Sequence, residues 1–135
     1  MCGIKNSLMS ATAEEILDRF RESWIATEKI YNNLIDSHPG FNRLIPVYIF
    51  IQKLRDSGQD KYFRLGSYNN HLIFSRAINA ELRADQKFLK LEVKDDFYEI
   101  TLKDAKKMYR QYKIKDLEDS RLTGLFEILK ETLID

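Results

Sequence analysis

The sequence has little of what disulfides, metal sites and sharp turns require. Its 135 residues include one cysteine, two histidines, two prolines and five glycines. One cysteine cannot form an internal disulfide, and His38 and His71 are far apart in the chain and belong to no Cys/His cluster. Because a zinc site needs several such ligands at short spacing, we expect no metal and no other cofactor.

Long apolar runs and an excess of charge of one sign are also missing. The longest apolar run, LIPVYIFI at 44–51, is interrupted by Pro46 and is well short of the roughly 18 residues of a membrane-spanning helix. We find no secretory signal pattern, so we expect a cytoplasmic protein without a membrane partner. The 22 basic and 21 acidic side chains nearly balance, which argues against a broad electrostatic contact with nucleic acid or anionic lipid.

The common nucleotide and hydrolase motifs are absent as well. The sequence contains no G-x-x-x-x-G-K-[ST], no G-x-G-x-x-G and no G-x-S-x-G. Nothing therefore indicates a phosphate-binding loop, a dinucleotide site or a serine nucleophile in a strand-to-helix turn. With 44% apolar and 32% charged residues, the composition is that of an ordinary folded domain, and a chain of this length is expected to form one domain.

The opening residues, MCGI, resemble the start of class II glutamine amidotransferase domains, in which an N-terminal cysteine is the nucleophile. That resemblance would make Cys2 a catalytic residue. The residues that follow, KNSLMS, lead into a helix start, whereas the family places its cysteine at the start of a strand. We therefore interpret residues 1–8 as a disordered leader and residues 9–135 as a single domain.

Two helices are predicted in the N-terminal half. Thr12 and Glu15 form a capping box, and apolar residues then recur at helical spacing. The next apolar segment has the β-branched and aromatic content of a strand, but Pro46 near its start and Gly58 at its end are helix boundary signals. We predict helices at 13–36 and 44–57.

The C-terminal half is predicted to be mostly β-sheet. Short apolar runs at 61–66 and 71–76 indicate a hairpin, residues 77–86 indicate a short helix or a loop, and alternating residues within 87–114 indicate a three-stranded meander. An apolar stripe after Asp116 or Asp119 predicts a final helix. The expected fold is α+β, with two N-terminal helices, a largely antiparallel sheet of about five strands and a C-terminal helix packed on that sheet.

The alternation of apolar residues also predicts the strand register. A two-residue turn at Asp95-Asp96 keeps apolar residues opposite one another, and it sets Glu92 opposite Glu99. The following turn would then need three residues to bring Met108 opposite Leu102. The predicted pair of carboxylates costs stability unless a cation lies between them.

One candidate catalytic set includes that position. Asp85, Glu92 and Lys94 resemble the D…(D/E)-x-K constellation of restriction-endonuclease-like nucleases, in which two carboxylates hold a divalent cation and the lysine activates water. Glu92 and Lys94 fall on one face of a strand, as that motif requires. The same short motif also occurs by chance on an ordinary solvated sheet face that is rich in lysine and glutamate.

The outer face of the predicted sheet mixes lysines with aromatic residues. Its members are Lys90, Lys94, Phe97, Thr101, Lys103, Lys107, Tyr109, Gln111 and Lys113. This composition is typical of stacking platforms for single-stranded nucleic acid, of protein-contact faces and of solvated faces alike. A second patch of arginines, including Arg83, surrounds the predicted turn at 68–70. The candidate binding residues are Phe97, Tyr109, Lys103, Lys107, Arg64 and Arg76.

These patterns favour binding over catalysis. Each candidate catalytic set is explained equally well by an ordinary structural role of the same residues. The sequence does, however, contain charged faces with aromatic residues, which are typical of binding surfaces. We expect a small, non-catalytic binding module that acts through contact with another protein. The first alternative is a metal-dependent nuclease that uses Asp85, Glu92 and Lys94, and the second is a nucleic-acid-binding sheet face.

Overall fold

The first helix of the described residues, α2 (Ala13–Ser37), begins directly after the predicted capping residue. The computed structural model describes residues 12–68, 71–78, 86–104 and 107–132, without the side chains of 108 and 109. The predicted leader at 1–8 lies outside these residues. The Thr12 hydroxyl accepts a hydrogen bond from the Glu15 amide at 3.1 Å, and Trp24 is fully buried on the inner side of the helix. The prediction of a long amphipathic helix is confirmed.

The segment with mixed strand and helix signals is helical. A 3-10 helix, η1 (Pro39–Leu44), leads into α3 (Ile45–Asp56), and Pro46 lies in its first turn. Gly58 follows with a φ of 89°, in the left-handed region that commonly ends a helix at glycine. The boundary signals outweighed β propensity because propensity is a weak preference that packing overrides, and here the buried residues repeat at helical spacing.

Five strands form one antiparallel sheet in the order β1-β2-β3-β4-β5. They are β1 (Arg64–Tyr68), β2 (His71–Ser75), β3 (Lys87–Val93), β4 (Tyr98–Asp104) and β5 (Lys107–Ile114). The predicted N-terminal hairpin is present, although its first strand starts at Arg64 instead of Lys61. Between β3 and β4 the register is the predicted one, with Glu92 opposite Glu99. Most of the segment predicted as a short helix or loop, 77–86, lies outside the described residues.

The register between β4 and β5 differs from the prediction. Asp104 pairs with Lys107, so the turn is shorter than the expected three residues. A bulge within β5 then sets Arg110 opposite Leu102, where Met108 was expected, and that part of the prediction is wrong. The extra residue is taken up inside the strand, where a bulge increases the local twist, instead of in the turn.

The last helix, α4 (Ser120–Lys130), packs against the sheet as predicted. The Asp119 carboxylate accepts a hydrogen bond from the Arg121 amide at 2.9 Å and caps the helix. Its buried face carries Phe126, whose ring meets Phe74 of β2 edge-on with 4.8 Å between ring centroids. Such aromatic pairs stabilise a core beyond the area that they bury.

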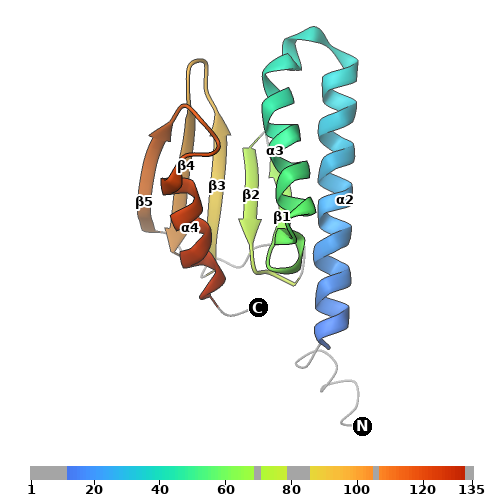
Figure 1. Cartoon of the computed structure of the whole chain (residues 1–135), viewed down its shortest axis with the longest axis vertical. Coiled ribbons are helices and arrows are strands. Elements are labelled where there is room, and N and C mark those ends of the chain that lie inside the picture. The colour runs from blue at the N-terminus through green and yellow to red at the C-terminus, as the bar shows by residue number, and fades with distance from the viewer. Residues whose placement is uncertain (1–11, 69–70, 79–85, 105–106, 133–135) are drawn as a thin grey trace.

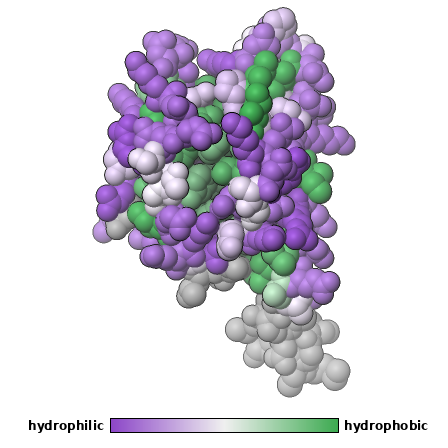
Figure 2. All heavy atoms as spheres, viewed as in Figure 1, coloured by the Kyte–Doolittle hydropathy of each residue, from purple (hydrophilic) through white to green (hydrophobic). Residues whose placement is uncertain are grey.

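The three α-helices of the described residues lie on the same face of the sheet (Figure 1). Every strand contributes buried apolar residues to a single core with these helices, so the molecule has two layers and the expected α+β fold is confirmed. Seen from the helix side, apolar residues gather in the middle of the surface and polar residues surround them (Figure 2). The helices are also tied to each other, because Arg55 of α3 donates to Glu28 of α2 at 2.6 Å.

Helix α2 also covers the free edge of β1. The Leu65 amide donates to the Ser23 hydroxyl at 3.0 Å, and the Thr27 hydroxyl lies 3.3 Å from the Leu65 carbonyl oxygen, to which it donates. Just before the strand, the Trp24 indole donates to the Phe63 carbonyl at 2.8 Å. An edge strand otherwise presents unpaired backbone groups. Side chains of α2 therefore form hydrogen bonds with backbone groups at the edge of β1, as a sixth strand would do.

Candidate binding surface on the open sheet face

No helix among the described residues packs on the second face of the sheet, which we call the open sheet face. The strand registers place alternate residues on it, most of them polar or charged. Among the residues that the structure describes, its cations outnumber its carboxylates by five to two. The cations are Arg64, Lys90, Lys94, Lys103 and Lys113, and the carboxylates are Glu92 and Glu99. In a chain of nearly balanced charge, this face is locally basic.

Glu92 lies at the centre of a network of charges on the open sheet face. Its side chain is nearly buried, because Lys90 and Lys94 reach over it from the same face, with Nζ–O distances of 2.7 Å and 3.0 Å. The Nδ1 atom of His71 lies 3.8 Å from the same carboxylate. Burial alone would raise the pKa of Glu92, but the hydrogen bonds from the two lysines outweigh it, and the pKa falls to about 2.

The residues of the proposed nuclease set are placed only in part. Glu92 and Lys94 are ion-paired with each other, while Asp85 lies outside the described residues. Both oxygens of Glu92 meet lysine ammonium groups, which is the arrangement of a neutralised surface carboxylate. Within the described ranges, no group of three or more His, Cys, Asp and Glu side chains is arranged to hold a metal ion.

The described aromatic residues of the open sheet face are Phe88, which is half-buried on β3 between Ser75 and Lys103, and two rings at the ends of strands. Phe97 follows the β3–β4 turn, and the Lys113 ammonium lies 5.2 Å from its ring centroid. Tyr68, at the end of β1, is 68% exposed. In the middle of the face, Gln111 donates to the Thr101 hydroxyl at 3.1 Å, and Thr101 is almost completely buried. The centre of the face therefore combines these polar side chains with the half-buried Phe88 and with Ile73, which lies opposite Lys90.

Two predicted members of this face are placed differently or not at all. Lys107 pairs with Asp104, and alternation along β4 turns that pair toward the helix side, so its assignment to the outer face is wrong. The cause is the bulge in β5, which reverses the alternation expected for the start of the strand. The side chain of Tyr109 is not among those described.

The candidate arginine patch is engaged in contacts with the backbone. The Arg64 guanidinium donates to the Ile78 carbonyl at 2.9 Å, and that of Arg76 donates to the Tyr62 carbonyl at 2.8 Å. Burial lowers the pKa of both groups. Arg83 lies outside the described residues. Both placed arginines therefore hold the segments that flank the hairpin, and their part in binding stays a prediction.

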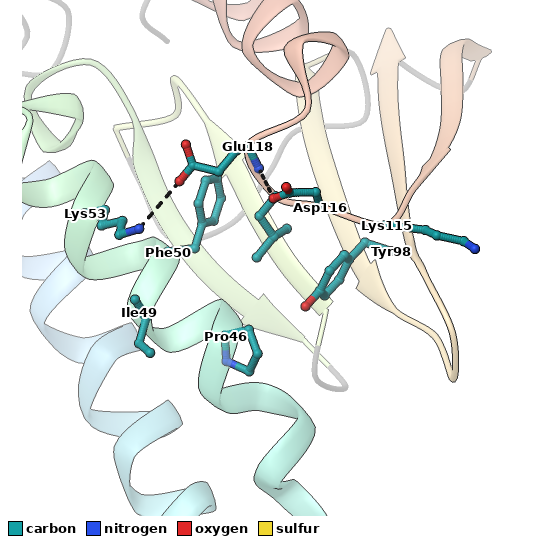
Figure 3. A pocket seen from close by; sticks show the side chains of 9 residues that line it. Pro46, Ile49, Phe50, Lys53, Tyr98, Lys115, Asp116 and Glu118 are labelled. Atoms are coloured by element: carbon teal, nitrogen blue, oxygen red, sulfur yellow. Dashed lines mark hydrogen bonds and ion pairs between the residues drawn. The ribbon is translucent and has the colours of Figure 1, made fainter.

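A groove on the helix side of the molecule was not predicted from the sequence. It has a volume of about 450 Å³ and lies between α3 and the connection from β5 to α4 (Figure 3). Ile49 and Phe50 of α3 form one wall, and Tyr98 and the residues at 115–118 form the other. Burial, reinforced by the negative charge of Asp116, raises the pKa of Tyr98. The only sequence signal was an isoleucine at each of positions 45 and 49, one helical turn apart, which a buried α3 would also show.

No family model, no curated protein and no solved structure matches the chain. Within the part of the chain that the structure describes, no helix carries an apolar stretch long enough to cross a membrane.

Proposed function

We propose that the protein is a small, non-catalytic binding module that contacts an acidic surface of another protein through the open sheet face. The observation that supports this proposal is the excess of cations on a sheet face that no described helix covers. Antiparallel sheets can leave one side to solvent, but here the charges of the uncovered side are predominantly of one sign. With a single cysteine in the sequence, we propose that it acts in the cytoplasm.

The arrangement of charges favours a protein over a nucleic acid. A stacking platform for single-stranded bases needs exposed aromatic rings along the path of the strand, whereas the described ring in the middle of this face, Phe88, is half-buried, and Thr101 and Gln111 lie nearby. Glu99 lies on the same face, opposite Glu92, and its charge would repel a phosphate backbone. A protein surface can combine carboxylates for the lysines with a donor for Glu99.

Lys103 and Lys113 are the residues through which we expect most of the attraction. Lys90 and Lys94 already neutralise Glu92, so they add less to an incoming partner. Lys113 is exposed and lies beside Phe97, which gives a partner both a charge and an apolar ring. Such mixed contacts are common at protein interfaces.

Fluorescence anisotropy with a labelled polyglutamate peptide tests the proposal at low and moderate salt. The wild-type protein should bind the peptide, and the double variant Lys103→Glu/Lys113→Glu should bind about tenfold more weakly, since each exposed ion pair contributes a few tenths of a kcal/mol and reversal counts twice. The matched control is Arg21→Glu/Lys29→Glu, which makes the same change of charge on exposed residues of α2 and should bind like wild type.

Three results would contradict the proposal. The first is that the wild-type protein does not bind polyglutamate, and the second is that the two double variants lose equal affinity for it. The third is that the wild-type protein binds a single-stranded oligothymidylate of similar charge more tightly than polyglutamate. The last result would favour the nucleic-acid-binding alternative, because base stacking adds affinity that a peptide of equal charge lacks.

A further inference from the structure

The groove beside α3 is bordered by apolar residues that face solvent. Ile49 in its wall is 45% exposed, and Ile45, one helical turn earlier, is 38% exposed. Residues four apart on a helix are neighbours on the same side, so the two form a short apolar ridge. Ile45 is outside the groove lining and Ile49 is part of it, so a protruding side chain and a recess adjoin each other on one helix.

The charges around this site balance. Lys53 pairs with Glu118 at 3.6 Å across the groove, as Figure 3 shows, and both side chains are well exposed. Near the start of α3, Arg43 pairs with Asp95 at 3.5 Å. Both signs of charge are thus present around the groove, in contrast to the basic open sheet face. A partner of strong net charge gains nothing here, whereas a surface with the same mixture of charges can pair with it.

A surface with a ridge, a recess and both signs of charge meets the requirement of a two-fold symmetric interface, in which one patch must be complementary to itself. We propose that the α3 groove binds a second copy of this chain. The two α3 helices lie antiparallel about a two-fold axis that passes beside positions 45 and 49, and Ile45 of each copy enters the groove of the other. The ammonium of Lys53 and the carboxylate of Glu118 then lie at the margin of the interface, where water remains.

The open sheet face does not offer a second copy the same fit. Two such faces would bring five cations against five cations, with two carboxylates on each side to offset them. Like charges placed opposite each other across an interface cost several kcal/mol. The dimer therefore leaves the open sheet face free, and it does not depend on the binding function proposed above.

Sedimentation velocity tests this inference on the full chain over a range from about 5 µM to about 500 µM. The apolar ridge is small, so the association should be weak, with half of the chains paired in the range of about 10–100 µM. The weight-average mass of the wild-type protein should rise toward twice the monomer mass. Ile49→Asp should stay monomeric throughout, because it places a charge in the wall of the groove that receives Ile45 of the other copy.

The matched control is Ile30→Asp. Ile30 is also 45% exposed and also lies inside a helix, but that helix is α2 and Ile30 is not among the residues that line the groove. It should associate like wild type. Circular dichroism shows whether Ile49→Asp folds. If it does not, the milder variant Ile45→Ser takes its place, and we expect it to weaken pairing. A wild-type protein that is monomeric at every concentration would overturn the inference, as would equal effects of the Ile49 and Ile30 substitutions.

Discussion

The two faces of the sheet are built from the same strands and yet depend on different forces. On β3, Leu91 points into the helix layer and is almost fully buried, while its neighbours Lys90 and Glu92 form an ion pair at 2.7 Å on the other side. The helix side is held by apolar burial, whose contribution does not depend on pH. The open side is held by charge pairs, which respond to pH, to salt and to a partner.

This difference separates stability from recognition. A substitution on the helix side removes buried area and leaves a cavity, whereas a substitution on the open side changes a charge that water can partly replace. We therefore expect the effects of substitutions on the free energy of unfolding to fall from the core outward.

Trp24→Ala should be the most destabilising substitution, with a loss of about 3–5 kcal/mol in the free energy of unfolding. Trp24 is fully buried, and its indole also donates to the Phe63 carbonyl at 2.8 Å. Urea denaturation followed by far-UV circular dichroism measures the loss. A value below about 1 kcal/mol would mean that the helix layer contributes far less than its burial indicates.

Adjacent positions on β3 give the sharpest contrast between the two faces. Leu91→Ala should cost about 2–5 kcal/mol, because Leu91 lies in the core. Lys90→Ala should cost less than about 1 kcal/mol, since it removes one partly solvated ion pair. Both variants can be compared with wild type in the same denaturation series. Similar losses at the two positions would contradict the division into an apolar face and a charged face.

Glu92→Gln should show the pH dependence of the open side. The pKa of Glu92 is about 2 in the folded protein, below its ordinary value of 4.5. Its charge therefore stabilises the fold above about pH 4.5, and this contribution is lost as the pH falls toward about 2. The variant should be less stable than wild type by about 1–2 kcal/mol at neutral pH, and the difference should shrink in acid.

The same pair of proteins tests the nuclease alternative. Denaturation at neutral pH is repeated with millimolar Mg²⁺, and we expect no change in either protein. A gain in the stability of wild type that Glu92→Gln lacks would indicate a cation bound at this carboxylate. A difference between the two proteins that does not vary with pH would instead contradict the assigned charge state of Glu92.

The smallest effect is expected for the pair of carboxylates that face each other. The sequence alone predicts that Glu99→Lys stabilises the sheet, but Glu99 also faces Lys113 on β5, so a single reversal exchanges one like-charge pair for another. The double variant Glu99→Lys/Lys113→Glu keeps opposite charges at positions 99 and 113, and it replaces the like charges at positions 92 and 99 by opposite charges. It should gain a few tenths to about 1 kcal/mol, whereas Glu99→Lys alone should change stability by less than about 0.5 kcal/mol. A loss in the double variant, measured by the same urea denaturation, would contradict this account.

The fold was predictable where local signals and packing agree. The capping box at Thr12 and the boundary signals at Pro46 and Gly58 indicated two helices that the structure contains. The alternation in β3 and β4 gave the correct register because a slip of one residue would turn every apolar side chain to water. The register of β5 was not predictable in this way, since a bulge breaks the alternation at a position that the sequence does not mark.

The candidate surface was predictable only as a composition. Lys103 and Lys113 were assigned to the outer face correctly, because alternation places them there. The contacts of Arg64 and Arg76 with distant carbonyl groups depend on where the chain turns back, and no periodicity encodes that. The groove beside α3 depends on the path of the residues at 115–118, which follow the strand without a regular pattern.

The hydrogen bonds from α2 to the edge of β1 have a consequence for amide exchange. The Leu65 amide is bonded to the Ser23 hydroxyl and not to a strand, so its protection from deuterium depends on the docking of a helix. Each time α2 lifts away, this amide exchanges and the edge of β1 is open to the strand of another chain. The exchange rate of one amide would therefore report how often this edge becomes available for pairing with another chain.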